Sequence, residues 1–351
     1  MNQPKIAIII INWNGKHLLE ECLNSAENQD YDNYKIIFVD NGSKDKSVEF
    51  VKNKFPKVEI ISLNKNTGFA KANNIGIHKA FEDSETEYVA LLNNDAITEK
   101  SWLSEMVKVI KQDNKIGSVA PKVLKYFRRD EIDSIGMKIR FNGGGTNIGA
   151  NKKDKKQYDD IKEVFGTTGC SCLYKRKMLE DVVMSGDNCF DNDFFAFCED
   201  VDLAWRARLR DWKSFTAPKS VVYHKGSETF QVYSFVKAFY SHRNRLFVIF
   251  KNFPLKFLIK GMYKFFLNYF YSLESLFLKR GYSAKTKEKI GIINVIRVIV
   301  EGWSSFFISL FKTFKKRNYI QKEKVVTNKE ILEWFKKFGE DKNMAKEEYI
   351  K

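Results

Sequence analysis

Residues 5–15, KIAIIIINWNG, carry the pattern that decides the fold, an unbroken apolar run that stops at a polar turn. Similar apolar runs follow at 35–39 (KIIFV), 58–63 (VEIISL) and 88–92 (YVALL), each bounded by Asn, Gly or Asp. Runs of this kind are typical of strands buried on both faces of a mostly parallel sheet. The first run is too short and too lightly charged for a signal peptide, so we expect a buried first strand.

Helical segments are predicted between these strands, over residues 16–27, 45–54 and 70–82, and a further one over 99–112. Alternation of strand and helix predicts an open α/β sheet with flanking helices rather than a bundle or a sandwich. Residues 141–160 carry glycines and charges without periodicity, and we expect a mobile loop there.

Composition and charge narrow the class of protein. Hydrophobic residues make up 44% of the 351, which is enough for a packed core and excludes intrinsic disorder. The five cysteines, an odd number without C-x-x-C spacing, favour reduced thiols in a cytoplasmic protein. The net charge is +16, and residues 241–351 contribute +14 of it. Such a regional excess predicts two parts with different partners.

The basic C-terminal part is also aromatic. Within 254–272, three lysines recur every four residues beside a wide apolar arc, a pattern typical of an interfacial amphipathic helix; the lysines are Lys256, Lys260 and Lys264, and the arc contains Phe257, Leu258, Phe265, Phe266 and Phe270. Residues 290–311 are long enough to span a bilayer but are interrupted by Arg297 and Glu301, which are spaced to pair. Three interpretations stay open for this part: a surface that binds an anionic membrane through 246–311, a span, or a helical subdomain packed on the catalytic core.

Polar clusters follow three of the predicted strands: Asn12 to Gly15, Asp40 to Ser43, and Asn93 to Asp95. Open α/β sheets bind ligands at the carboxyl ends of their strands, so these clusters point to one crevice. Turn formation alone explains any one of them, but three together favour a site.

Three carboxylates and a histidine are candidates for chemistry. Asp95, directly after a buried strand, is placed to hold Mg²⁺ or Mn²⁺ together with a diphosphate. Glu199 and Asp200 open a helix beside the apolar run FFAFC, where loss of water would raise a carboxyl pKa toward that of a general base. Asp202 is spaced to pair with Arg206, which indicates a structural role. His224 ends a strand-like run and could bind a metal or a phosphate.

Six segments, in this order, resemble the family 2 glycosyltransferases with the GT-A fold, and within them the rhamnosyltransferase-like branch. The segments are VDNGSKD (39–45), NTGFAKANNIG (66–76), LLNNDA (91–96), GTTGCSCLYKR (166–176), EDVDLAWRARLRDW (199–212) and VYHKGS (222–227). The resemblance covers about residues 5–245 and implies a GT-A catalytic domain over 1–240. A helical amphipathic region at 241–315 and a charged tail at 316–351 would follow.

The resemblance also implies how a nucleotide sugar would be bound. Asp40 would hydrogen-bond the base, helped by the backbone near Asn12 and Asn14. Gly68 and Asn73 would lie against the sugar and the diphosphate of a UDP- or dTDP-linked donor.

Further positions match the metal and acceptor sites of the family. Asp95 matches the last carboxylate of the metal motif, where Asn94 and its neighbour replace the other aspartates of many relatives. His224 matches a late histidine near the metal. Thr168 and Gly169 match the loop that shapes the sugar and acceptor site. With one carboxylate left, we expect the divalent cation to arrive with the nucleotide.

For catalysis, the resemblance implies inverting transfer of one sugar to a hydroxyl of a glycan or lipid-linked acceptor, in the synthesis of cell-surface polysaccharide or glycoconjugate. Asp200 matches the general base, and Glu199 lies beside it. We expect a cytoplasmic hexosyltransferase that is peripheral on the inner face of the cell membrane.

Three alternatives remain. A processive synthase is disfavoured because RARLRDW lacks the glutamine of the Q-x-x-R-W motif. A nucleic-acid-binding protein would explain the basic charge but not the interleaved Phe, Leu and Ile, and we expect no nucleic acid. A non-catalytic homologue that binds sugar nucleotides is suggested by the two asparagines before Asp95.

Overall fold

The computed structural model describes residues 3–184, 188–226, 234–278 and 281–339. The chain divides into two compact units. Unit 1 comprises Met1–Met137, Asn147–Phe195 and Asp211–Thr229, and unit 2 comprises Lys138–Thr146, Ala196–Arg210 and Phe230–Lys351. Domain boundaries at 240 and 315 stay a prediction.

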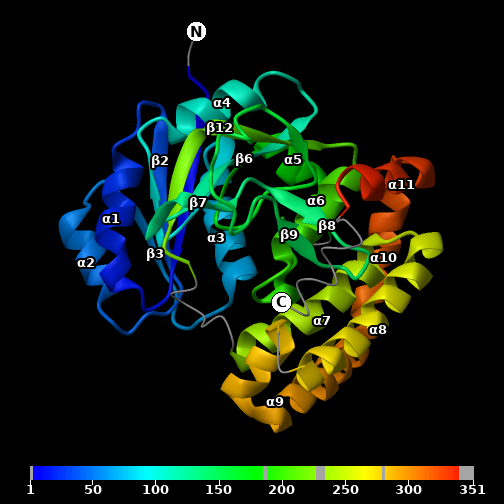
Figure 1. The fold of residues 1–351 in the computed structure, drawn as a ribbon. Helices are drawn as coiled ribbons and strands as arrows, with labels where there is room; N and C mark the ends of the chain where they lie inside the picture. Colours follow the sequence, from blue (N-terminus) through cyan, green and yellow to red (C-terminus); the bar gives the residue numbers. More distant parts are fainter. Residues whose placement is uncertain (1–2, 185–187, 227–233, 279–280, 340–351) are drawn as a thin grey trace. The chain divides into compact units, whose positions relative to one another are not determined.

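Unit 1 begins with the predicted alternation of strands and helices (Figure 1). The strands pair in parallel in the order β4-β1-β2-β3, with bounds β1 (Lys5–Asn12), β2 (Tyr34–Asp40), β3 (Glu59–Ser62) and β4 (Thr86–Asn93). The helices are α1 (Lys16–Glu27), α2 (Ser47–Lys54), α3 (Phe69–Phe81) and α4 (Trp102–Ile110). Each predicted strand and helix is confirmed to within three residues at either end.

The rest of the sheet mixes directions. β11 (Ser171–Lys175) is antiparallel to both β4 and β6 (Ile116–Lys125), and β12 (Lys213–His224) runs parallel to β6. Short antiparallel strands complete it: β5 (Ala96–Thr98), β7 (Arg128–Ser134) and β10 (Glu163–Val164). The helix α5 (Arg176–Asp181) follows β11. The sheet therefore carries β1, β2 and β4 side by side, with their polar carboxyl ends at one edge.

The alternation of side chains along β1 divides the core between the two faces of the sheet. Ile6, Ile8 and Ile10 are buried with residues of α1, α2 and α4. On the opposite face α3 approaches closely, because a Cβ at Gly76 would lie 2.6 Å from the side chain of Ile9. The start of α3 is held near the end of β2 by Asn41, whose Nδ2 donates to the Gly68 carbonyl at 3.3 Å.

The sequence predicted an irregular loop over residues 141–160. The structure differs, because the short strand β9 (Gly145–Asn147) forms within this segment and pairs with β8 (Met137–Ile139). Later in the segment, Asp154 and Asp159 accept hydrogen bonds from the buried Lys122 ammonium of β6, at 2.9 and 2.5 Å. These ion pairs attach the later part of the segment, around Asp154 and Asp159, to β6.

Unit 2 is helical, as predicted for the C-terminal region. Its helices are α6 (Glu199–Leu209), α7 (Phe235–Asn252), α8 (Leu255–Leu278), α9 (Gly281–Ile308), α10 (Leu310–Glu323) and α11 (Asn328–Lys337). Trp205 of α6 packs against Phe253, Trp334 and Phe335, so the core of this unit is aromatic. α11 begins with a capping box formed by Thr327 and Glu330.

Candidate active site

The ends of β1, β2 and β4 are joined through one buried side chain, Asn12. Its amide nitrogen donates to Asp40 Oδ1 at 3.3 Å and to Ser43 Oγ at 3.2 Å. Its amide oxygen accepts from Asn94 Nδ2 at 2.7 Å. The prediction that the three polar clusters meet is confirmed, and we call Asn12, Asp40, Ser43 and Asn94 the strand-end cluster.

The turn after β2 is built on the same carboxylate. Asp40 Oδ2 accepts from the Ser43 amide at 2.9 Å, so both oxygens of this buried group are hydrogen-bonded. Asn14 is exposed, has φ of 51°, and accepts from the Lys44 amide at 2.8 Å. Asn14 thus ties the turn after β1 to the turn after β2.

The turn that leads into α3 needs glycine at position 68. Gly68 has φ of 86°, and a Cβ there would lie 2.5 Å from the ring of Phe195. Asn41 holds this turn: its Nδ2 donates to the Gly68 carbonyl at 3.3 Å and its Oδ1 accepts from the Thr67 amide at 2.8 Å. Asn73 is buried one helical turn further on and donates to the Phe69 carbonyl at 2.9 Å.

His224 lies between two carboxylates. Its Nε2 is 3.3 Å from Asp95 Oδ1, and its Nδ1 is 2.8 Å from Asp133 Oδ2. Burial alone would lower the pKa of His224, but contacts with Cys170, Asp133 and Asp95 outweigh it and raise that pKa well above 6.5. The structure thus confirms that His224 and Asp95 come together.

The pair can hold a divalent cation. An imidazole nitrogen and a carboxylate oxygen lie side by side at 3.3 Å, both nearly buried, and both are ligand types that Mn²⁺ accepts. Histidines that bind metals usually donate their second ring N–H to a carboxylate, which is the position of Asp133. Among the described residues, no three His, Cys, Asp or Glu side chains converge into a metal centre. The remaining ligands would have to come from a bound diphosphate and water.

The loop before β11 contributes buried hydroxyls. Thr167 donates to the Tyr174 hydroxyl oxygen at 3.0 Å, and Thr168 is 8% exposed. Gly169 is half-buried, and the carbonyl of the next residue, Cys170, accepts from the Asn93 amide at 2.8 Å. Thr168 and Gly169 therefore lie one to two residues from the backbone contact with β4.

In unit 2, the first turn of α6 carries the two candidate catalytic carboxylates. Glu199 is 6% exposed and its Oε2 has no hydrogen-bond partner among the described residues. Burial, and then the charge of Asp200, raise the pKa of Glu199 well above its usual value. Asp200 is half-buried, and its Oδ1 accepts from the Val201 amide at 2.8 Å. The predicted rise in pKa is confirmed for Glu199.

Asp202, one turn along, is structural. It is fully buried and pairs with Arg206 at 3.0 Å, as its spacing predicted, and with Lys251 of α7 at 2.8 Å. Asn252 donates to the same carboxylate at 2.8 Å. α7 therefore fixes the position of α6.

A second contact with α7 supports the segment just before α6. Three residues of this segment, Phe195, Phe197 and Cys198, have φ between 61° and 69° without being glycine. The fully buried Asn244 donates to the carbonyls of Ala196 and Phe197, at 2.8 and 2.7 Å. These hydrogen bonds hold a backbone conformation that L-residues rarely adopt.

Sequence reasoning assigned no role to Asp133, Asn41 or Asn244. Asp133 belongs to the charged stretch RRDEIDS, in which its sequence context looks like that of an ordinary solvent-exposed aspartate. Asn41 belongs to the polar cluster after the second strand, Asp40 to Ser43, but its hydrogen-bond partners at 66–68 are distant in the sequence. No local signal marks Asn244, since its importance comes from the carbonyls it meets.

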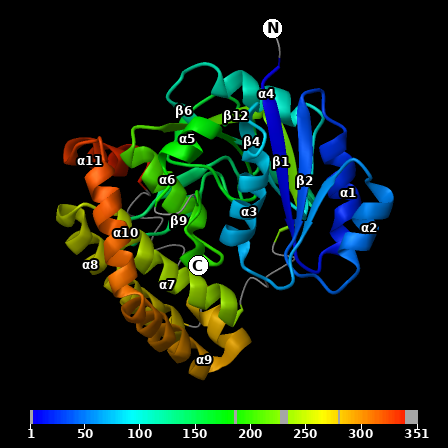
Figure 2. The ribbon, with the colours of Figure 1, turned by 180° about the vertical axis from the view of Figure 1, so that it is seen from behind.

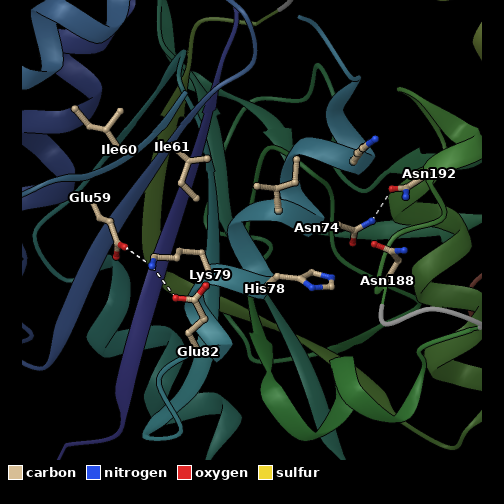
Figure 3. A pocket seen from close by; sticks show the side chains of 11 residues that line it. Glu59, Ile60, Ile61, Asn74, His78, Lys79, Glu82, Asn188 and Asn192 are labelled. Carbon is tan, nitrogen blue, oxygen red and sulfur yellow. Dashed lines mark hydrogen bonds and ion pairs between the residues drawn. The ribbon is translucent and has the colours of Figure 1, made fainter. Parts of the chain in front are cut away.

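A surface hollow of about 620 Å³ lies elsewhere on unit 1, between β3 and α3 (Figure 3). Its lining is mixed: Lys79 pairs with Glu59 and Glu82, and Asn74 donates to Asn192. None of the predicted site residues lines it. The hollow is therefore separate from the strand-end cluster.

The family model described as glycosyl transferase family 2 matches residues 7–183. An uncharacterised glycosyltransferase of Haemophilus influenzae is 32% identical over 119 residues, which are 33% of this chain and 46% of that protein. A poly-β-1,6-N-acetyl-D-glucosamine synthase of Staphylococcus epidermidis is 25% identical over 228 residues, 64% of this chain and 50% of the synthase. The chain spans about half the length of these curated relatives.

Solved structures match over most of the chain. A mannosyltransferase from Pyrobaculum calidifontis, in complex with GDP-Man and Mn²⁺, matches with a TM-score of 0.51 and 16% identity. The match covers 92% of this chain and 86% of the other. This likeness concerns the fold and confirms the predicted GT-A architecture with a helical C-terminal region.

Proposed function

The chain belongs to glycosyl transferase family 2, and from that premise we propose that it transfers one sugar, with inversion, from a nucleoside-diphosphate sugar to a hydroxyl group. The observation that carries the proposal is the strand-end cluster, where Asn12 brings Asp40 and Asn94 together beside Asp95 and His224. Ligands of open α/β sheets bind at this edge.

The donor would be bound by unit 1. Asp40, Asn12 and the backbone near Asn14 would hydrogen-bond the base of a UDP- or dTDP-linked sugar. Gly68 and Asn73 would lie against the sugar and diphosphate. Support for Gly68 comes from its φ of 86°, which favours glycine at this position. The turn into α3 therefore carries no side chain there.

Asp95 and His224 would hold Mg²⁺ or Mn²⁺ when the donor binds. The bound cation would stabilise negative charge on the departing diphosphate. Asp133 would orient the His224 ring through Nδ1, at 2.8 Å. A neighbour of the same fold was solved with GDP-Man and Mn²⁺, which supports a divalent cation here.

Asp200 would act as the general base. It would accept the proton of the acceptor hydroxyl while that oxygen bonds to the anomeric carbon and the bond from this carbon to the diphosphate breaks. Glu199 is buried beside it, where burial and then the charge of Asp200 raise the pKa of Glu199. Thr168 and Gly169 would shape the sugar and acceptor site.

For the acceptor we propose a glycan or lipid-linked hydroxyl of a cell-surface polysaccharide or glycoconjugate, reached from the cytoplasmic side of the cell membrane. Support comes from the name of the staphylococcal relative, which synthesises a polysaccharide. Three exposed apolar residues of α8, each directly followed by a lysine, support the membrane location: Leu255, Ile259 and Tyr263.

A thermal-shift titration with UDP and dTDP, each with and without Mn²⁺, tests donor binding. A nucleotide at about 100 times its Kd should stabilise the protein by about 2.7 kcal/mol, a shift of several degrees. Asp95→Ala should abolish the metal-dependent part of the shift. No shift with either nucleotide would contradict the proposal.

Turnover is tested separately with Asp200→Asn. We expect at least ~100-fold loss of transfer, because a general base contributes about 10²–10⁴-fold, with nucleotide binding unchanged. Asp211→Asn, a half-exposed aspartate just past the end of α6, is the matched control and should keep its activity. Nucleotide binding without turnover in the unaltered protein would instead favour the non-catalytic homologue, which the two asparagines before Asp95 suggest.

A further inference from the structure

Three helices of unit 2 leave large apolar side chains exposed. On α8 these are spaced by three or four residues along one side of the helix, and they are 47–72% exposed: Leu255, Ile259, Tyr263, Phe266 and Phe270. Phe257 and Phe265 are at most 5% exposed, so another side of α8 packs inward. The apolar arc of this helix is thus wider than its packing requires.

α9 and α10 repeat the pattern. Their outward residues are 49–86% exposed: Ile293, Ile296, Val300, Phe307, Ile308, Phe311 and Phe314. The opposite side of α9 is occupied, because Phe306 contacts Phe247 of α7 and a Cβ at Gly302 would lie 2.6 Å from the ring of His242. α9 therefore has one face on α7 and one face in solvent.

The two exposed stripes are joined through Trp303. This ring stacks on Phe266 of α8, with centroids 5.4 Å apart, and on Phe307 of its own helix at 5.6 Å. Figure 2 shows α8 and α9 in the same part of unit 2. The residues of both stripes therefore form one apolar face, which we call the α8–α10 face. Contiguous faces of this kind mark interaction sites.

Lysines next to the α8–α10 face indicate the kind of partner that it would bind. Lys256, Lys260 and Lys264 are exposed and each directly follows an apolar residue of the α8 stripe. On α10, Lys312 and Lys315 directly follow Phe311 and Phe314. Lysines that flank buried apolar groups can extend to the headgroups of an anionic bilayer, where each contributes favourably.

Within the described residues, Ala284–Ile308 of α9 is the one helix apolar and long enough to span a membrane, with a mean hydropathy of 1.4. The helix is broken, however, because Gly291 has φ of 80° and ψ of 158°. The part after the break, Ile292–Ile308, is about 25 Å long, shorter than a hydrocarbon core of about 30 Å. It also carries the Arg297–Glu301 ion pair and rests on α7.

We propose that the α8–α10 face is a peripheral binding surface for an anionic phospholipid bilayer, on which α8, α9 and α10 lie in the plane of the interface without crossing it. Their apolar residues would enter the boundary between headgroups and acyl chains. The proposal deepens the proposed membrane location but needs no catalytic step, so its test is independent of transfer.

Co-sedimentation of the full chain with vesicles tests it. We expect binding to vesicles of phosphatidylcholine mixed with phosphatidylglycerol, weakened by salt, and little binding to phosphatidylcholine alone. Ile296→Asn combined with Phe307→Ser should reduce the partition coefficient by about 10- to 100-fold. The matched control combines Phe127→Ser with Ile161→Asn, two exposed apolar residues of unit 1, and should bind as the unaltered chain does.

The basic contribution is tested with Lys256→Gln combined with Lys264→Gln. About 1 kcal/mol for each lysine converts to a loss of roughly 30-fold, and Lys44→Gln with Lys57→Gln, on exposed lysines of unit 1, is the control. Nucleotide-induced thermal shifts should be unchanged in all four variants, which separates this proposal from the proposed function.

Three results would overturn the proposal: no binding to either vesicle; equal loss in the control variants; or a dimer, seen by sedimentation, that Ile296→Asn with Phe307→Ser dissociates while vesicle binding is absent. The last result would show that a second copy of the chain covers the face. Binding to RNA of the same strength as binding to anionic vesicles, and unaffected by the apolar variants, would also contradict it.

Discussion

In unit 1, His224 lies between Asp95 and Asp133, whereas in unit 2 His242 lies beside the rings of Phe265 and Tyr269. Contacts with acidic groups raise the pKa of His224 well above 6.5 despite its burial. Burial, and then the charge of Arg245, lower the pKa of His242 to about 4. The surroundings of the two histidines therefore shift their pKa values in opposite directions, upward in unit 1 and downward in unit 2.

The carboxylates differ in the same way. Asp40 of unit 1 is buried and accepts hydrogen bonds on both oxygens. Glu199 of unit 2 is buried with one oxygen unpartnered among the described residues, which favours its neutral form. In the strand-end cluster of unit 1, the buried carboxylate of Asp40 is thus satisfied by hydrogen bonds, as a binding site needs. Unit 2 uses burial to shift a pKa, as proton transfer needs.

The largest expected effect concerns Asp202, a buried carboxylate of unit 2 that, unlike Glu199, is paired with positive charges. Lys251→Met should lower the free energy of unfolding by about 3–5 kcal/mol, because it leaves a buried carboxylate with too little positive charge. Chemical denaturation measures it. Lys115→Met, in the exposed pair with Asp211, should cost about 0–1 kcal/mol. Equal losses would show that burial does not strengthen the Asp202 pairing.

The neutral state of His242 makes stability depend on pH. The folded pKa of about 4 lies below the ordinary 6.5, so the unfolded chain binds the proton first as pH falls. Stability should therefore decrease between pH 6.5 and 4, by roughly 2–3 kcal/mol from this group. The groups around it are Arg245 and the Tyr269 hydroxyl, 3.2 Å from Nε2.

Denaturation of the unaltered chain and of His242→Gln, across that range, isolates the contribution. The variant should show a flatter dependence on pH between 6.5 and 4. Identical slopes would mean that other groups cause the loss of stability.

In the strand-end cluster, the orientation of Asn12 explains why position 94 is an amide. Asn12 Nδ2 already donates to Asp40 and Ser43, so its oxygen faces Asn94 and requires a donor there. Asn94→Asp should lower the free energy of unfolding by about 1–3 kcal/mol at pH 7. The loss should shrink at acidic pH, because a protonated carboxyl can donate. A loss independent of pH would contradict this account.

The smallest expected effect concerns the geometry before α6. Asn244→Ala releases the carbonyls of Ala196 and Phe197, so we expect about a tenfold lower kcat with unchanged nucleotide affinity. Asn252→Ala, another fully buried asparagine of α7, contacts Asp202 instead and serves as the control. A similar fall in kcat for both variants would assign the effect to general loosening of α7.

Much of the fold could be predicted because it depends on local patterns. The apolar runs and polar ends of β1, β2 and β4 are contiguous in sequence, and parallel strands place their carboxyl ends at one edge. The meeting of Asn12, Asp40 and Asn94 followed from that rule and is confirmed. The roles of these residues toward a nucleotide stay predictions.

Other features depended on distant contacts. The two short strands around residue 140 could not be read from a stretch without periodicity. In the C-terminal part, the lysine and phenylalanine spacing of α8 predicted an amphipathic helix. The spacing did not show which aromatic residues pack inward, because Phe265 and Phe266 differ only by one position.

The sequence by itself determined the strand and helix order of the first half, the edge of the sheet where polar groups collect, and the basic, aromatic character of the end. Those properties follow from residue type and period. Only the tertiary structure decided that Asp133 contacts His224, that Asn244 supports the segment before α6, and that His242 is neutral. Each of these depends on which groups surround a side chain after folding. In the folded chain, burial and neighbouring charges set the pKa of a side chain, and neighbouring donors and acceptors decide its hydrogen bonds.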